Sequence, residues 1–263
     1  MFKLRTIALA ACATAVTAMP AAQAADIAPA PIPQVVLKGW YLRGDIGYSN
    51  QQVDGIDNVL FAGTADLEFH TLNFEAGPTF GGGIGYRFNK WLRFDVTGEY
   101  RGETEFHGLD TWTDGNGDPR FNDYTAKKSE WLVLANAYVD LGTWHGLTPF
   151  AGVGVGAANV AIRSFRDRGI AYGTPGDPTT GFPTLAYAND RDKWNFAWAL
   201  YGGLGFEVTD AFTVELAYRY LDMGDGESGD LIAFDGTNAI NNPMKFEDLT
   251  SHDVRLGFRY AFW

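Results

Sequence analysis

The final stretch of the chain, Val254-Arg-Leu-Gly-Phe-Arg-Tyr-Ala-Phe-Trp263, alternates large apolar side chains with arginines and small residues. Successive side chains of a β-strand point to opposite faces, so this alternation places the apolar residues on one face. Arg255 and Arg259 then lie on the other face. The stretch is therefore predicted to be a strand with one apolar and one polar face.

Seven earlier stretches show the same period of two, at about residues 39–49, 79–88, 91–101, 130–141, 149–162, 194–207 and 212–220. A few residues join every second pair, whereas roughly 25 to 30 residues separate the others, which is unusual in a compact soluble domain. Short turns alternating with long loops, with an even number of strands, are typical of a barrel that spans the outer membrane. We therefore predict an all-β fold, an eight-stranded antiparallel up-and-down transmembrane β-barrel with four long extracellular loops.

The chain is predicted to have three parts. Residues 1–24 begin with basic residues, continue with an apolar segment and end in small residues, as a signal peptide does. Residues 25–38 are rich in alanine and proline and are expected to form an extended periplasmic lead-in, because proline cannot donate to a strand ladder. Residues 39–263 form the barrel, and the protein is expected in the bacterial outer membrane after export across the inner membrane.

Cys12, the only cysteine, lies within residues 1–24 in a sequence that also matches a lipoprotein cleavage box. Cleavage there would leave an apolar region of only about seven residues, so cleavage after Ala24 is favoured. The formal net charge is −12 for the whole chain and −14 without residues 1–24, which contain Lys3 and Arg5. This acidity argues against nucleic acid as a partner.

Charged residues alternate with the apolar ones and are expected to face the barrel interior. An interior of eight strands is just wide enough for side chains to fill it. Acids and arginines are nearly balanced there, as a network of ion pairs requires. The alternative is a narrow polar pore, since inward glycines on the second and fifth strands leave space for water. The predicted interior charge network comprises Arg43, Asp45, Arg87, Arg93, Asp95, Glu99, Arg101, Glu130, Asp140, Glu207, Glu215, Arg219, Asp253, Arg255 and Arg259.

Aromatic residues gather near the strand ends, where tryptophan and tyrosine form girdles at the membrane–water interfaces. An alternative for a ring near a loop is stacking on a sugar or a haem. The predicted interface aromatics are Trp40, Tyr48, Trp91, Tyr100, Trp131, Trp194, Tyr218, Tyr220 and Trp263.

The predicted loops are mostly acidic. Asp114-Gly-Asn-Gly-Asp118 has the spacing of the first ligands of an EF-hand, but Pro119 and Thr125 stand where glycine and glutamate belong, so a turn is predicted. The third loop differs because basic residues lie near its ends, where lipopolysaccharide phosphates would lie. These bases are Arg163, Arg166, Arg168, Arg191 and Lys193.

Signals for catalysis are weak. The four histidines show no metal-ligand spacing. Ser251-His252-Asp253 contains the residue types of a hydrolase triad, but neighbouring residues of a strand face opposite ways and do not meet in one site. No catalytic residue, metal site or cofactor is expected.

Three segments resemble the small outer-membrane proteins of the opacity/porin-like barrel family of α-proteobacteria. They are Gly39-Trp-Tyr-Leu-Arg-Gly-Asp-Ile-Gly-Tyr48, Thr148-Pro-Phe-Ala-Gly-Val-Gly-Val-Gly156 and Val214-Glu-Leu-Ala-Tyr-Arg-Tyr-Leu-Asp-Met-Gly224, together with the aromatic C-terminal strand. The resemblance implies an abundant surface protein tied to membrane integrity or host contact, or in some members to porin or haem-binding activity. One departure is that Phe262 lies in phase with the outward residues and Trp263 one residue beyond, so either can be the aromatic that the assembly machinery reads.

The expected function is that of a structural and surface-interaction protein of the envelope, with a passive, low-conductance porin as the alternative. The expected partners are membrane lipids, lipopolysaccharide, the outer-membrane assembly machinery and a host or surface ligand bound through the loops. A monomer is expected.

Overall fold

The computed structural model describes residues 39–115, 117–174 and 177–262. The predicted signal peptide, the lead-in and Trp263 lie outside these residues. No helix in the described part of the chain is long and apolar enough to cross a membrane.

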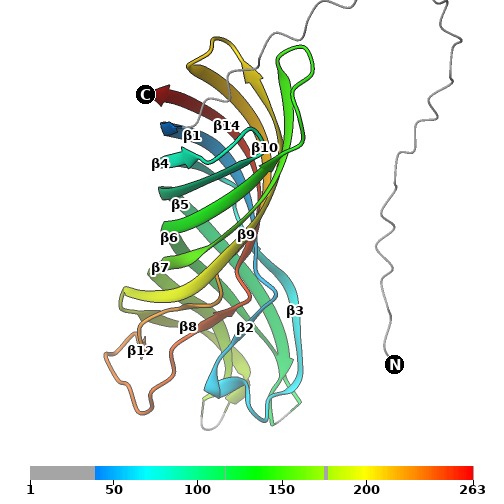
Figure 1. Ribbon diagram of the computed structural model, residues 1–263. Coiled ribbons are helices and arrows are strands. Elements are labelled where there is room, and N and C mark those ends of the chain that lie inside the picture. The colour runs from blue at the N-terminus through cyan, green and yellow to red at the C-terminus, as the bar shows by residue number, and fades with distance from the viewer. Residues whose placement is uncertain (1–38, 116, 175–176, 263) are drawn as a thin grey trace, which may run out of the picture. The chain divides into compact units, whose positions relative to one another are not determined.

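Eight long strands form the wall of a barrel (Figure 1). Each pairs antiparallel with its two neighbours, and the first pairs with the last, so that the sheet closes on itself. The predicted eight-stranded barrel is confirmed. Its strands are β1 (Gly39–Gln52), β4 (Gly77–Arg87), β5 (Leu92–Thr113), β6 (Pro119–Asp140), β7 (Leu147–Thr174), β9 (Arg191–Glu207), β10 (Phe212–Asp222) and β14 (Thr250–Phe262).

The two faces of the wall follow the alternation in the sequence. In β1, Leu42 and Ile46 are 52% and 48% exposed, whereas Arg43 and Asp45 between them are 9% and 5% exposed. Ile46 pairs with Leu256 of β14 on one side and with Phe80 of β4 on the other, so the outward apolar residues form continuous rows across strands. Such an outward apolar band suits contact with lipid.

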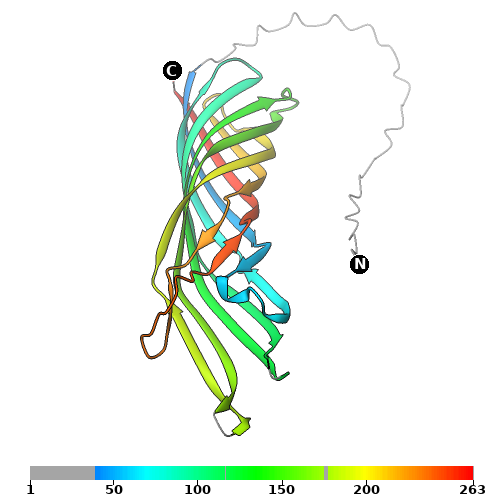
Figure 2. The same ribbon diagram turned by 90° about the horizontal axis from the view of Figure 1, so that it is seen from below.

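The long connections, which were predicted to be loops, contain much β-structure. β5 and β6 have 22 residues each and β7 has 28, and they continue beyond the barrel as long hairpins (Figures 1 and 2). The period of two resumes in these extensions, because buried and exposed residues alternate along residues 104–110 of β5 after a register shift between Arg101 and Thr104. The remaining strands of the connections are β2 (Gly55–Asp57), β3 (Ala65–Phe74), β8 (Asp177–Ala188), β11 (Gly226–Glu227), β12 (Leu231–Ala233) and β13 (Lys245–Glu247).

Candidate functional site

The barrel lumen gathers most of the charged residues expected there. Thirteen of the fifteen are at most 9% exposed, because each alternates with an outward apolar residue of its strand. These thirteen are Arg43, Asp45, Arg93, Asp95, Glu99, Arg101, Glu130, Asp140, Glu215, Arg219, Asp253, Arg255 and Arg259.

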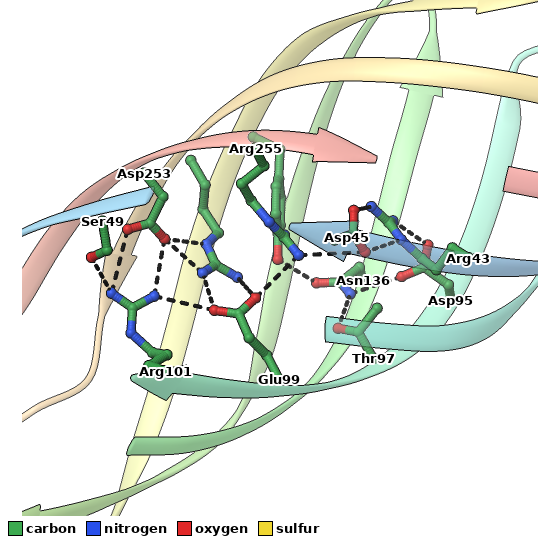
Figure 3. A network of polar contacts seen from close by, with 12 residues as sticks. Arg43, Asp45, Ser49, Asp95, Thr97, Glu99, Arg101, Asn136, Asp253 and Arg255 are labelled. Atoms are coloured by element: carbon green, nitrogen blue, oxygen red, sulfur yellow. Dashed lines mark hydrogen bonds and ion pairs between the residues drawn. The ribbon is translucent and has the colours of Figure 1, made fainter. Parts of the chain in front are cut away.

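One group of ion pairs centres on Arg219 of β10. Its guanidinium donates to Glu99 of β5 at 2.9 Å and to Asp253 of β14 at 2.8 Å. Arg101 binds the same Asp253 at 3.1 Å, and Arg255 lies 3.1 Å from Glu99 (Figure 3). Two acids are thus shared among three arginines, a geometry that the planar guanidinium fork permits.

A second group surrounds Arg43 of β1. Arg43 binds Asp45 and Asp95, each at 2.7 Å, and donates to the Tyr138 hydroxyl at 2.9 Å. Asn136 donates to the other oxygen of Asp95 at 2.8 Å. Arg255 lies 3.5 Å from Asp45 and therefore joins this group to the first (Figure 3).

A third group lies toward the periplasmic ends of the strands. Glu215 forms ion pairs with Arg259 at 2.8 Å and with Arg93 at 3.1 Å. Arg93 also forms an ion pair with Asp140 at 3.1 Å. The Arg93 guanidinium carbon lies 4.1 Å from the centre of the Tyr138 ring. Together the three groups neutralise charges whose burial without partners would cost several kcal/mol each.

Two predicted members lie at the rim and not in this network. Arg87 and Glu207 continue the inward phase of β4 and β9 but stand where these strands end, next to the short turns. Arg87 is half-buried and Glu207 is exposed. The prediction of an interior position is wrong for Glu207, because the wall no longer encloses it.

Lys128 is an inward base that was not predicted from the sequence. This residue is fully buried and contacts Glu130 and Gln51, with its amino nitrogen 4.4 Å from the centre of the Phe74 ring. The expectation that every inward base is an arginine is therefore wrong. The available signal was its spacing, because Lys128 lies two residues before Glu130 and shares its face, but the strand was expected to start at Glu130.

Inward glycines do not leave empty space in the wall. A Cβ atom at Gly85 would overlap the ring of Tyr41, one at Gly152 the ring of Tyr138, and one at Gly203 the ring of Phe150. These three glycines thus make room for aromatic rings. At Gly85 and Gly152 these rings occupy the space that was expected to hold water, and at Gly83 and Gly156 the backbone of the neighbouring strand leaves no room for a Cβ atom.

An apolar cap lies beyond the charged groups on the extracellular side. β2, β13 and β11 form a three-stranded sheet, and the fully buried Phe246 of β13 packs against Phe106, Phe74 and Phe165 at ring distances of 5.0, 5.7 and 6.3 Å. Phe106 stands five residues beyond Arg101 along β5. We call the cluster formed by Ile56, Phe74, Phe106, Phe165, Met244, Phe246 and Leu249 the apolar cap.

The predicted interface aromatics face outward. Trp40 and Trp91 lie near the short turns, whereas Tyr48, Tyr100, Trp131, Trp194 and Tyr218 lie toward the extended ends, and these seven are 37–64% exposed. Tyr220 is partly exposed. Two levels of aromatic side chains thus border the apolar band, as interfacial girdles do.

His252 lies on the outer face, where its Nδ1 is 2.5 Å from the Tyr218 hydroxyl. Ser251 and Asp253 face the lumen and are fully buried. These three residues therefore do not form a triad.

A closed eight-stranded barrel with an outward apolar band and a charged lumen defines a β-barrel protein of the outer membrane. The chain belongs to the outer membrane protein beta-barrel domain family, whose model matches residues 8–262. This confirms the family resemblance found in the sequence and the outer-membrane location.

Relatives in other bacteria agree with this assignment. An uncharacterized protein of Brucella suis biovar 1 is 33% identical over 94% of this chain and 95% of its own length. Outer membrane protein PagN of Salmonella typhimurium is 29% identical over 86% of this chain and 90% of its own. The crystal structure of Neisserial surface protein A has 15% identity and a TM-score of 0.41, and covers 85% of this chain and 97% of the other.

Proposed function

We propose that this protein is a structural and surface-interaction barrel with a filled interior, and not a channel. The observation that carries the proposal is the two-layer filling of the lumen. Ion pairs and aromatic rings occupy the level of the membrane-spanning strands, and the apolar cap lies above them. Water that threads such a lumen has to pass an apolar layer in which Phe106 and Phe246 are fully buried.

The proposed partners follow from this role. Lipids and lipopolysaccharide surround the outward apolar band, the assembly machinery inserts the barrel, and the extended hairpins present a surface for a ligand. Residues 1–24 are proposed to be the cleaved signal peptide and residues 25–38 a periplasmic lead-in. The barrel is proposed to be monomeric.

A low-conductance porin is the second candidate, and one observation favours it. Several buried polar atoms in the described part of the lumen lack a hydrogen-bond partner, among them Nη1 of Arg93 and Nε of Arg255. Buried polar atoms of this kind are commonly satisfied by ordered water. A continuous file of such waters would make a narrow pore.

Single-channel conductance of the refolded chain in a planar bilayer separates the two functions. A filled barrel gives no openings, migrates as a heat-modifiable band, and stays silent in the Glu99→Gln/Glu215→Gln variant. Steady openings whose ion selectivity changes in that variant would establish a pore and overturn the proposal. Glu103→Gln/Glu105→Gln is the matched control, because these two acids are exposed outside the lumen.

A further inference from the structure

A β-bulge in β7 decides which side chains the extracellular hairpin presents. Ser164 has a positive φ of 52°, a conformation uncommon for a residue other than glycine, and its amide donates to Asp190 at 3.0 Å. The pairing of β6 with β7 shifts between Thr125 and Lys127 at this point. A bulge exchanges the two faces of the strand beyond it. Phe165 is consequently buried, and Arg166 and Arg168 face outward.

Each outward arginine is the first residue of a row of neighbouring side chains. Both rows run from β7 across β8 to β12 or the residue that follows it. Arg166 pairs with Tyr187 of β8, which pairs with Ile232 of β12. Arg168 pairs with Leu185, whose carbonyl accepts from the amide of Phe234 at 3.0 Å. Phe234 is 73% exposed, and Tyr187 and Leu185 are 39% and 40% exposed. We call these six residues the arginine–aromatic patch. Three of them, Arg166, Leu185 and Tyr187, line a groove of about 720 Å³ beside Phe165.

The two arginines differ from the other bases nearby. Arg163 binds Asp192, Arg191 binds Glu227, and Lys193 binds Asp225, at 2.8, 3.4 and 3.5 Å. Within the described residues, Arg166 and Arg168 form no ion pair. Arg168 lies opposite the exposed Asp123 of β6 without forming an ion pair with it, whereas Arg166 lies opposite the uncharged Thr125. The patch therefore offers guanidinium groups that an anion can bind, above all that of Arg166.

The patch stands above the lipid. Thr125 and Asp123, the β6 partners of Arg166 and Arg168, lie six and eight residues beyond the girdle residue Trp131. At about 3.3 Å per residue and a strand tilt of about 40°, this places the arginines roughly 15–20 Å above the girdle. A headgroup layer is only about 5–8 Å thick. Contact with lipid therefore does not account for the exposed Tyr187, Leu185 and Phe234.

We propose that the arginine–aromatic patch binds the anionic core sugars of lipopolysaccharide in the same leaflet. This inference rests on the proposed function, because it assumes a barrel whose hairpins stand among those sugars. The arginine forks match phosphate and carboxylate groups, and the exposed rings of Tyr187 and Phe234 offer apolar faces for sugar rings. Because the bulge at Ser164 exchanges the two faces of β7, both arginines point outward toward the core sugars.

The test uses the refolded full chain in phosphatidylcholine nanodiscs, titrated with a phosphorylated lipopolysaccharide core oligosaccharide freed from lipid A. We expect saturable binding that weakens at least about tenfold in Arg166→Gln/Arg168→Gln, since each charge-assisted hydrogen bond contributes roughly 1.5–3 kcal/mol. Tyr187→Ser/Phe234→Ser should also weaken it. The matched control is Lys127→Gln/Arg163→Gln, which removes two bases already paired with acids and should bind within about twofold of wild type.

Equal binding by wild type and Arg166→Gln/Arg168→Gln, or undiminished binding of the dephosphorylated oligosaccharide, would overturn the inference. So would an absence of binding to a wild-type barrel that remains heat-modifiable, or a preference of the wild-type barrel for a sulfated glycan or a protein over the core sugars. A barrel that conducts but binds through the patch would reject the proposed function alone. A silent barrel that does not bind would reject only this inference.

Discussion

Arg219 shows how single residues hold the lumen together. It is 1% exposed and lies between Glu99 and Asp253, which come from strands on either side of the barrel interior. Neither acid has enough water around it to remain charged at low cost without a cation. A buried residue of this kind stabilises the fold chiefly by preventing the cost of leaving its partners unpaired.

Replacing Arg219 by methionine should lower the free energy of unfolding by about 3–5 kcal/mol, because two buried carboxylates lose a shared partner. Urea unfolding in detergent micelles measures the change. Arg163→Met is the control, since its ion pair with Asp192 is partly exposed and should contribute at most about 1 kcal/mol. Equal effects of the two substitutions would show that the lumen charges are well hydrated.

At the scale of elements, the hairpin extensions have polar chemistry of their own. Asp110 of β5 is buried and accepts from the Tyr124 hydroxyl at 2.6 Å and from the Asn122 side chain at 3.0 Å. Asp167 of β7 lies opposite Tyr124 in the pairing. Burial, and then the neighbouring carboxylates of Asp110 and Asp123, raise the pKa of Asp167 to about 7.

This shift predicts a pH dependence of the extension. Unfolded aspartate loses its proton near pH 4, whereas folded Asp167 keeps its proton up to about pH 7. The folded state therefore binds more protons between these values, and the stability of the extension should fall as pH rises through that window. Carboxyl NMR titration in micelles, together with amide exchange of β6 and β7, measures it.

Asp167→Asn should flatten the pH dependence, whereas Asp192→Asn, at an exposed acid in β9, should not. An Asp167 carboxyl that titrates near pH 4 would contradict the prediction.

For the whole molecule, the distribution of polar and apolar residues is the reverse of that in a water-soluble protein. Charges occupy the interior and apolar residues the outside, because the surrounding solvent is lipid. Val96 of β5 is 52% exposed and lies midway between Leu92 and the girdle residue Tyr100. If Val96 faced water, a polar substitution there would leave the free energy of unfolding almost unchanged. In the bilayer, the same substitution should lower it.

Val96→Arg should lower the free energy of unfolding in lipid vesicles by about 2–4 kcal/mol, because it places a charge at the bilayer midplane. Tyr48→Arg, at the level of the girdle, should cost only about 0–1 kcal/mol. If both variants unfold alike in vesicles, the outward band of β5 does not face lipid.

The sequence by itself determined the class of fold, the eight strands and the direction of nearly every side chain within them. These properties follow from a period of two, which is local and can be found in a few residues such as Val254 to Phe262. The sequence placed Glu207 inside the barrel and did not predict that Lys128 is buried. Both residues lie near the ends of the barrel wall, where burial depends on how far the neighbouring strands extend.

Only the tertiary structure decided which charges meet and what covers them. Glu99 and Arg219 are 120 residues apart, and their contact depends on the register of the closed sheet. The apolar cap joins residues from five separate parts of the chain, so no local pattern predicts it. The bulge at Ser164 reverses the alternation of β7, and a pattern continued straight through it would have turned Arg166 and Arg168 into the barrel.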